Sequence, residues 1–190
     1  MNTFAVRRHF VVILALGALA ITAPSSANTE FSTCLMSLQA QARSAGINES
    51  ILRDVVPSLQ QQERVISLDR KQPEFLQTFS EYLDLRVTPE RVERGRALLE
   101  KYRSFLLDLQ EQYGVPPQYL VSFWGLETNY GSYLGRMPTL DSLATLACDQ
   151  RRSDFFSGEF IAALQLMHRE SLEPADMQGS WAGAVGHTQF

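Results

Sequence analysis

The chain has 190 residues, of which 45% are hydrophobic and 20% are charged, and its formal net charge is −4. Proteins that bind nucleic acid neutralise phosphates with an excess of Lys and Arg, so this acidic balance argues against a nucleic-acid partner. The length suits a single domain with a sizeable core.

The first 27 residues have the pattern of a secretory signal peptide. Arg7 and Arg8 supply a charged start, residues 10–21 form an apolar run, and residues 24–27 offer small side chains for cleavage. The run is shorter than the roughly 20 residues of a membrane span, so a retained anchor is the less favoured alternative. Removal of this segment takes the formal charge from −4 to −6 and leaves about 163 residues. We expect the remainder to be soluble in the periplasm.

The two cysteines, Cys34 and Cys148, would meet oxidising conditions in an exported protein. A disulfide between them and a pair of buried free thiols both remain open, because the sequence gives no distance between the two side chains. They do not predict a metal site, since no histidine lies near them at the spacing of a metal ligand.

The hydrophobic pattern after the signal segment is helical almost throughout. An apolar stripe from Phe31 to Ala45 predicts a first helix that Gly46 closes. Asn48 can cap a short second helix that stops before Pro57. The chain therefore begins its folded part with two consecutive helices.

The middle of the chain continues the helical pattern with one exception. Residues 65–68 are the only run considered for a strand, and a further helix is expected over 73–83. Residues 88–113 predict one long amphipathic helix that Gly114 stops.

No internal repeat, low-complexity tract or linker divides the chain. The sequence therefore predicts one all-α domain over 28–190. We divide it into N-terminal helices over 31–113 and a catalytic part over 114–190.

The catalytic part opens with a helix that the prolines at 116–117 should begin. Leu120, Phe123, Trp124 and Glu127 share one face of it by helical spacing. Apolar neighbours disfavour the charged form of a carboxyl group, so we expect Glu127 to hold its proton to a higher pH than a surface glutamate, as a general acid must. On spacing alone, a solvated or Arg-paired glutamate at a helix end is the simpler interpretation.

Four segments change that interpretation. They are Gly-Leu-Glu-Thr-Asn-Tyr-Gly over 125–131, Leu-Asp-Ser-Leu-Ala-Thr-Leu-Ala over 140–147, Arg-Arg-Ser-Asp-Phe-Phe-Ser-Gly-Glu over 151–159, and Gly-Ser-Trp-Ala-Gly-Ala-Val-Gly-His-Thr-Gln-Phe over 179–190. In this order and spacing the chain resembles the lytic murein transglycosylase B family, lysozyme-like enzymes that cut bacterial peptidoglycan. The resemblance runs from about Phe31 to the last residue. It implies a helical fold of the goose-type lysozyme and transglycosylase kind, with room for a small β element.

The resemblance also implies a mechanism. Glu127 would protonate the β-1,4 bond between N-acetylmuramic acid and N-acetylglucosamine, then act as a base while the muramyl 6-hydroxyl closes onto C1 to give a 1,6-anhydro sugar. An ordinary glycosidase needs a second carboxylate, but Asp141 and Glu159 both have structural explanations, for Asp141 the compensation of a helix dipole. No metal or organic cofactor is implied.

The resemblance places further residues in the substrate groove. Ser180 would orient the catalytic carboxylate or an acetamido group, Gln189 would lie beside the acid, and Phe190 would form part of the wall. Arg151 and Arg152 would line the groove, although composition alone suggests a solvated surface pair.

Two adjacent positions depart from the pattern of the family. His187 and Thr188 stand where some members have Tyr and Gly. A lone histidine beside a glycine loop is more often a hydrogen-bonding residue than a general base, so we rank His187 below Glu127 for that role.

The expected partners are peptidoglycan glycan strands, with peptidoglycan synthases as further candidates, and we expect a monomer. Members of the family continue well past the position of Phe190, so we expect a truncated domain with weak or no activity. Two alternatives remain. One is a muramidase hydrolase that uses a second carboxylate, and the other is a non-catalytic peptidoglycan-binding scaffold.

Overall fold

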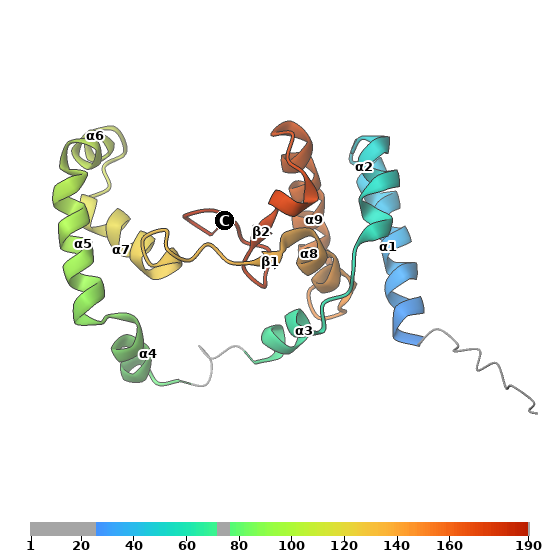
Figure 1. Cartoon of the computed structure of the whole chain (residues 1–190), viewed down its shortest axis with the longest axis horizontal. Coiled ribbons are helices and arrows are strands. Elements are labelled where there is room, and N and C mark those ends of the chain that lie inside the picture. The colour runs from blue at the N-terminus through green and yellow to red at the C-terminus, as the bar shows by residue number, and fades with distance from the viewer. Residues whose placement is uncertain (1–25, 72–76, 190) are drawn as a thin grey trace, which may run out of the picture.

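The computed structural model describes residues 26–71 and 77–189 of the chain. These residues are mostly helical and include one short two-stranded sheet. The helices form two groups that stand apart, and the C-terminal segment lies between them (Figure 1). The predicted signal peptide lies outside the described residues except for its last two, with which the first helix begins.

The first group contains helices from both ends of the described chain. Its elements are α1 (Ser26–Ser44), α2 (Glu49–Asp54), the 3₁₀ helix η1 (Val56–Ser58), α3 (Glu63–Arg70), α8 (Thr139–Cys148) and α9 (Ser153–Arg169). Helix α8 is buried on nearly every side, because α1, α3 and α9 all pack against it. Most residues of α8 are buried, and its Leu146 belongs to one buried cluster with Leu38, Phe160 and Leu164.

The second group is smaller. It comprises α4 (Phe79–Arg86), α5 (Pro89–Lys101), α6 (Arg103–Tyr113) and α7 (Pro117–Thr128). Helices α5 and α6 both pack on α7, around a small buried cluster of Leu106, Val121 and Tyr130. Each of the two groups therefore combines helices from the predicted N-terminal and catalytic parts.

A short two-stranded sheet pairs the end of the connection between α7 and α8 with a segment after α9. Strands β1 (Met137–Pro138) and β2 (Gln178–Gly179) pair antiparallel, and the 3₁₀ helix η3 (Pro174–Asp176) precedes β2. Gly135, at φ +84°, lies against the backbone of Gly179, and a Cβ at Gly135 would overlap it. The pairing of β1 with β2 confirms the expected small β element. Gly135 must be glycine for its segment to come this close to Gly179.

Most predicted helix ends are confirmed. The Asn48 side chain accepts the backbone N–H of Ser50 at 2.8 Å, and α2 begins there. Gly46 and Gly114 both adopt positive φ after α1 and α6. Caps are local features, which is why the sequence predicts them well.

Two predictions about the middle of the chain are wrong. Residues 65–68 are not a strand but part of α3, where Val65 and Asp69 are buried one turn apart. The predicted single helix over 88–113 is broken at Tyr102 into α5 and α6, which lets both helices pack on α7. The helix predicted over 73–83 begins only at Phe79, because Thr78 caps it with extended backbone, and it runs on to Arg86. Residues 72–76 lie outside the described part.

The alternative left open for the cysteines is decided in favour of a disulfide. Cys34 of α1 and Cys148 at the end of α8 are bonded, with their Cα atoms 5.8 Å apart. The bond joins two helices that already pack together in the first group. Within the described residues no helix is both long and apolar enough to span a membrane.

Candidate active site and groove

Helix α7 carries the predicted catalytic residue in its last turn. The buried positions of α7 are Val121, Gly125 and Thr128, whereas Phe123 is 63% exposed. The predicted apolar face is therefore wrong in part, because the face that packs on α5 and α6 is turned away from Phe123 and Glu127. Glu127 is exposed, and no hydrogen bond or ion pair engages its carboxylate among the described residues. The described residues do not provide the apolar surroundings that the sequence predicted for it.

The turn after Glu127 is held by a tyrosine that fills space between two glycines. A Cβ on Gly95 of α5 would lie 2.6 Å from the Tyr130 hydroxyl oxygen, and a Cβ on Gly125 of α7 would lie 2.7 Å from its ring. The hydroxyl of Tyr130 donates to the carbonyl oxygen of Arg91 at 2.7 Å. Both glycines are thus required for the ring to lock α7 against α5.

The residue next to Glu127 connects α7 to the C-terminal segment. The Thr128 hydroxyl donates to the carbonyl oxygen of His187 at 3.1 Å and accepts the N–H of Gly131 at 3.0 Å. The indole Nε1–H of Trp124 donates to Nδ1 of His187 at 3.1 Å. His187 is therefore a hydrogen-bonding residue, as the sequence favoured.

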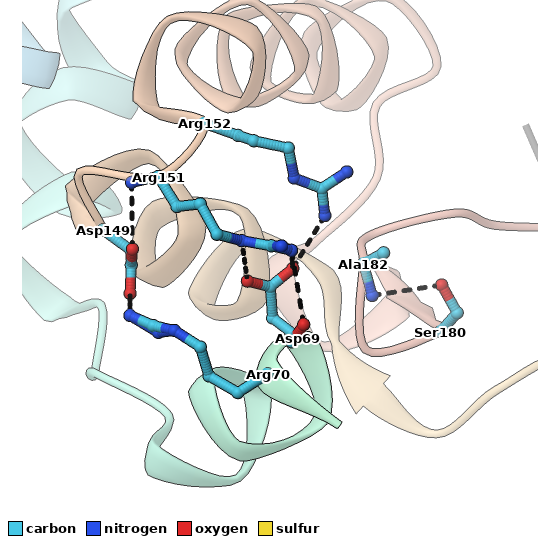
Figure 2. A network of polar contacts seen from close by, with 7 residues as sticks. All are labelled: Asp69, Arg70, Asp149, Arg151, Arg152, Ser180 and Ala182. Carbon is cyan, nitrogen blue, oxygen red and sulfur yellow. Dashed lines mark hydrogen bonds and ion pairs between the residues drawn. The ribbon is translucent and has the colours of Figure 1, made fainter. Parts of the chain in front are cut away.

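Ser180 shapes a turn of the C-terminal segment. Its Oγ accepts the backbone N–H of Ala182 at 3.3 Å and that of Ala184 at 3.1 Å, and its own N–H donates to the Ala184 carbonyl oxygen at 2.8 Å. Figure 2 shows the contact with Ala182. The hydroxyl is thus committed to the backbone of residues 180–184, and this turn sets the course of the segment toward His187.

Gln189 lies at the end of the described segment. Its Nε2 donates to the carbonyl oxygen of Gly186 at 2.8 Å and to that of Leu134 at 3.3 Å, so it ties the segment to the link after α7. Phe190, the predicted wall residue, lies outside the described residues.

The predicted groove arginines make an internal ion-pair cluster. Arg151 contacts the Asp69 carboxylate with two nitrogens, at 2.6 and 2.9 Å, and Arg152 reaches the same carboxylate at 2.7 Å (Figure 2). Asp69 is only 4% exposed, whereas both guanidinium groups reach the surface. The pair thereby ties α3 to the loop between α8 and α9.

Asp69 is ionised because of this cluster. Burial alone would raise its pKa, but the hydrogen bonds and charges of Arg151 and Arg152 together hold the pKa of Asp69 below its ordinary value. The hydrogen bond that Arg151 donates to the Asp69 carboxylate in turn raises the pKa of Arg151. A second pair, Arg70 with Asp149 at 2.6 Å, lies beside the first. Asp69 was not predicted from the sequence, where its only signal is a carboxylate one helical turn after the apolar Val65.

The two acidic residues considered as second carboxylates lie in different settings. Asp141, in the first turn of α8, accepts the backbone N–H of Gln60 at 2.5 Å, so it anchors the loop before α3. Glu159 is exposed on α9 and lines a cavity.

That cavity is open and has a volume of about 920 Å³. It lies among α8, α9 and the C-terminal segment, and its walls are mostly apolar, with Phe155 and Trp181 among them. Arg152 and Gln189 also line it, but Glu127, Ser180 and Arg151 do not. The structure therefore brings two of the predicted groove residues to the cavity and places the predicted acid elsewhere, on α7.

No group of three or more His, Cys, Asp or Glu side chains within residues 26–71 and 77–189 is arranged to hold a metal ion. The predicted acid chemistry requires none.

The fold is the all-α, lysozyme-like fold of the lytic transglycosylases. Over residues 30–190 the sequence matches the family model described as the transglycosylase SLT domain, and the chain belongs to that family. It is 38% identical over 105 residues to membrane-bound lytic murein transglycosylase B of Escherichia coli strain K12, a match that covers 55% of this chain and 29% of that protein. Relatives of this kind are lyases.

Two solved structures are similar over most of the chain. SltB3 from Pseudomonas aeruginosa, solved in complex with NAG-NAM-pentapeptide, is 35% identical with a TM-score of 0.76, covering 84% of this chain and 43% of that one. The lytic transglycosylase Slt35 of Escherichia coli, solved in complex with bulgecin A, is 28% identical with a TM-score of 0.73. The match covers 84% of this chain and 52% of that one. The chain thus spans about half the length of these relatives or less.

Proposed function

We propose that this chain acts as a peptidoglycan lytic transglycosylase and that Glu127 is its catalytic acid and base. One observation carries the proposal. Within residues 125–131 the polar neighbours of Glu127, namely Thr128, Asn129 and Tyr130, are each hydrogen-bonded to the protein, whereas the Glu127 carboxylate is exposed and has no partner among the described residues. The segment is built to hold this carboxylate in place while leaving it free for a substrate.

The substrate we propose is the glycan strand of peptidoglycan. Two complexes of SltB3 contain disaccharide pentapeptides, NAG-NAM in one and NAG-anhNAM in the other, which supports a groove for such strands in this family. For this chain we assign the groove to Ser180, Gln189, Phe190, Arg151 and Arg152. Arg152 and Gln189 border the described cavity, whereas Ser180 and Arg151 would act mainly by supporting the turn and the ion-pair cluster.

The chemistry needs one carboxyl group. Glu127, protonated, donates its proton to the oxygen of the MurNAc–GlcNAc bond as that bond breaks. The resulting carboxylate then takes the proton of the muramyl 6-hydroxyl, and the oxygen of that hydroxyl bonds to C1 of the same sugar. This closes a 1,6-anhydro ring and leaves Glu127 protonated again. Water does not enter the product, so the reaction is a lyase reaction.

A hydrolase with a second carboxylate is less well supported. Such enzymes place two carboxyl groups on either side of one glycosidic bond. Asp141 is bound to the backbone of Gln60, and Glu159 lines a cavity that Glu127 does not line. We therefore assign no second catalytic carboxylate.

Because peptidoglycan lies outside the cytoplasmic membrane, the proposal includes export, with residues 1–27 as the signal peptide. A monomer suffices for the chemistry, and peptidoglycan synthases are the candidate protein partners.

The test is digestion of purified cell-wall sacculi, with mass analysis of the released fragments. The wild-type chain should release anhydromuropeptides, and Glu127→Gln should lower the rate by about 10²–10⁴-fold, the usual contribution of a general acid–base group. Glu111→Gln, at another exposed glutamate near a helix end, is the matched control and should leave the rate unchanged. Fragments with reducing ends would instead make the chain a hydrolase. Binding to sacculi without release would make it a non-catalytic binding protein.

A further inference from the structure

The C-terminal segment bridges the two helical groups. At one end it is fixed to the first group, because β2 pairs with β1 and Trp181 packs against the main core. At the other end it meets α7 of the second group through His187. Figure 1 shows the segment crossing the space between the groups. The contacts of His187 therefore hold the segment directly to the helix that carries Glu127.

One of these contacts depends on protonation. Nδ1 of His187 accepts the indole N–H of Trp124 at 3.1 Å, and indole nitrogen is only a donor. The imidazole must therefore be neutral with its proton on Nε2. Protonation adds a hydrogen to Nδ1, so that both ring nitrogens are donors. The new N–H then faces the N–H of Trp124, and the hydrogen bond between the two side chains is lost.

The imidazole ring of His187 packs closely against Trp124 and Gly131. It lies with its centroid 5.9 Å from that of Trp124, and a Cβ on Gly131 would come within 2.5 Å of its Nδ1. Gly131 is thus required for the imidazole to reach the indole. The nearby Thr128 hydroxyl binds the His187 backbone, so both the side chain and the main chain of His187 are attached to the last two turns of α7.

We propose that neutral His187 is a pH-sensitive latch that positions the C-terminal segment against α7 and opens on acidification. It is a positioning residue and not a catalytic one, because it acts through Trp124 and Thr128. Its consequence for turnover rests on the proposed function, while the latch itself does not. The latch is closed while His187 is neutral and opens when its Nδ1 takes up a proton.

The charged and titratable neighbours of this contact lie around Trp124 and the end of α7. They are Tyr102 and Tyr130 against the Trp124 ring, Lys101 and Arg94 over those two tyrosines, and Glu127 one turn further along α7. None of them forms an ion pair or hydrogen bond with His187 in the described part of the chain. Loss of the indole contact is therefore not offset by another side-chain contact that His187 already makes.

Tryptophan fluorescence tests the latch directly. The chain has two tryptophans, so Trp181→Phe leaves Trp124 as the only tryptophan, which is excited selectively at wavelengths that tyrosine does not absorb. Protonated imidazole quenches an adjacent indole, so the emission should fall in one step as the pH is lowered from 8 to 5. His187→Gln should abolish the step, because a glutamine oxygen can accept the same hydrogen bond but does not titrate. His168→Gln, on α9, should retain it.

A second measurement covers the case in which Trp181→Phe does not fold. In the otherwise unchanged chain, the indole N–H resonance of Trp124, assigned with Trp124→Phe, should shift with pH over the same range and should not shift in His187→Gln. A pH-independent resonance, or an equal shift in His187→Gln, would overturn the proposal.

The link to turnover is tested with sacculi across the same pH range. Below the step the wild-type rate should fall by up to about tenfold per pH unit relative to the rate of His187→Gln. Equal profiles for the two chains would show that the latch does not position the acid. A fluorescence step in a chain that releases no anhydromuropeptides at any pH would instead overturn the proposed function and leave the latch standing.

Discussion

The hydroxyl of Tyr130 donates a 2.7 Å hydrogen bond to the backbone carbonyl oxygen of Arg91. Arg91 lies in the first turn of α5, whereas Tyr130 comes directly after the turn that ends α7. This contact ties the end of α7, and with it Glu127, to the start of another helix. Contacts of this kind hold the candidate site in place.

Gly125→Ala should destabilise the protein and lower its turnover. The new methyl group would lie 2.7 Å from the Tyr130 ring, so the ring or the helix must shift. Overpacking of this kind costs about 1–3 kcal/mol, measured as the free energy of unfolding in urea. Gly158→Ala is the control, because its Cβ meets nothing within 4 Å in α9, and it should stabilise the protein by about 0.5–1 kcal/mol. Equal effects of the two variants would contradict the packing argument.

Asp69→Asn should destabilise the first helical group and change its response to acid. The substitution removes a buried charge that binds Arg151 and Arg152, for an expected loss of about 1–3 kcal/mol. Because folding lowers the pKa of Asp69, its stabilising contribution is complete above about pH 4 and is lost as the pH falls through the folded pKa. Urea unfolding from pH 7 to pH 3 measures both effects.

The Asn variant should therefore lose less stability than the wild type between pH 5 and pH 3. Asp54→Asn, at the exposed pair with Arg53, should change little at any pH. An unchanged acid response in Asp69→Asn would show that the ion-pair cluster does not contribute to stability.

Reduction of the disulfide should lower the melting temperature. Cys34 and Cys148 are separated by 114 residues, and cross-linking a loop of this size stabilises a protein by about 4–5 kcal/mol in the chain-entropy model. Thermal unfolding with and without dithiothreitol measures the effect. The double variant Cys34→Ser with Cys148→Ser should unfold at the lower temperature under both conditions, and any sensitivity of that variant to reductant would point to another cause.

Ser180→Ala should loosen the turn over residues 180–184. The hydroxyl accepts two backbone N–H groups, and their loss should cost about 0.5–1.5 kcal/mol. If this turn supports the groove as we propose, binding of muropeptide fragments, measured by calorimetry, should weaken with it. Ser180→Thr keeps the hydroxyl and should restore part of both losses. Unchanged binding in Ser180→Ala would remove Ser180 from the groove.

The local features of the chain were predictable from its sequence. Asn48 and Thr88 begin helices, and Gly46 and Gly114 end them, because capping depends on a few neighbouring backbone groups. The order of the four motifs, ending at 179–190, was enough to indicate the family that the comparisons establish.

The tertiary structure decided what depends on distant contacts. The buried face of α7 includes Gly125 and excludes Phe123, because a tyrosine from beyond the helix fills the space at the glycine. The arginine pair is bound by Asp69, more than 80 residues earlier, and is not a free surface pair. Composition and spacing show which side chains lie on each face of a helix. Only the packed fold determines which of those side chains are buried, which are paired and which stay exposed to solvent.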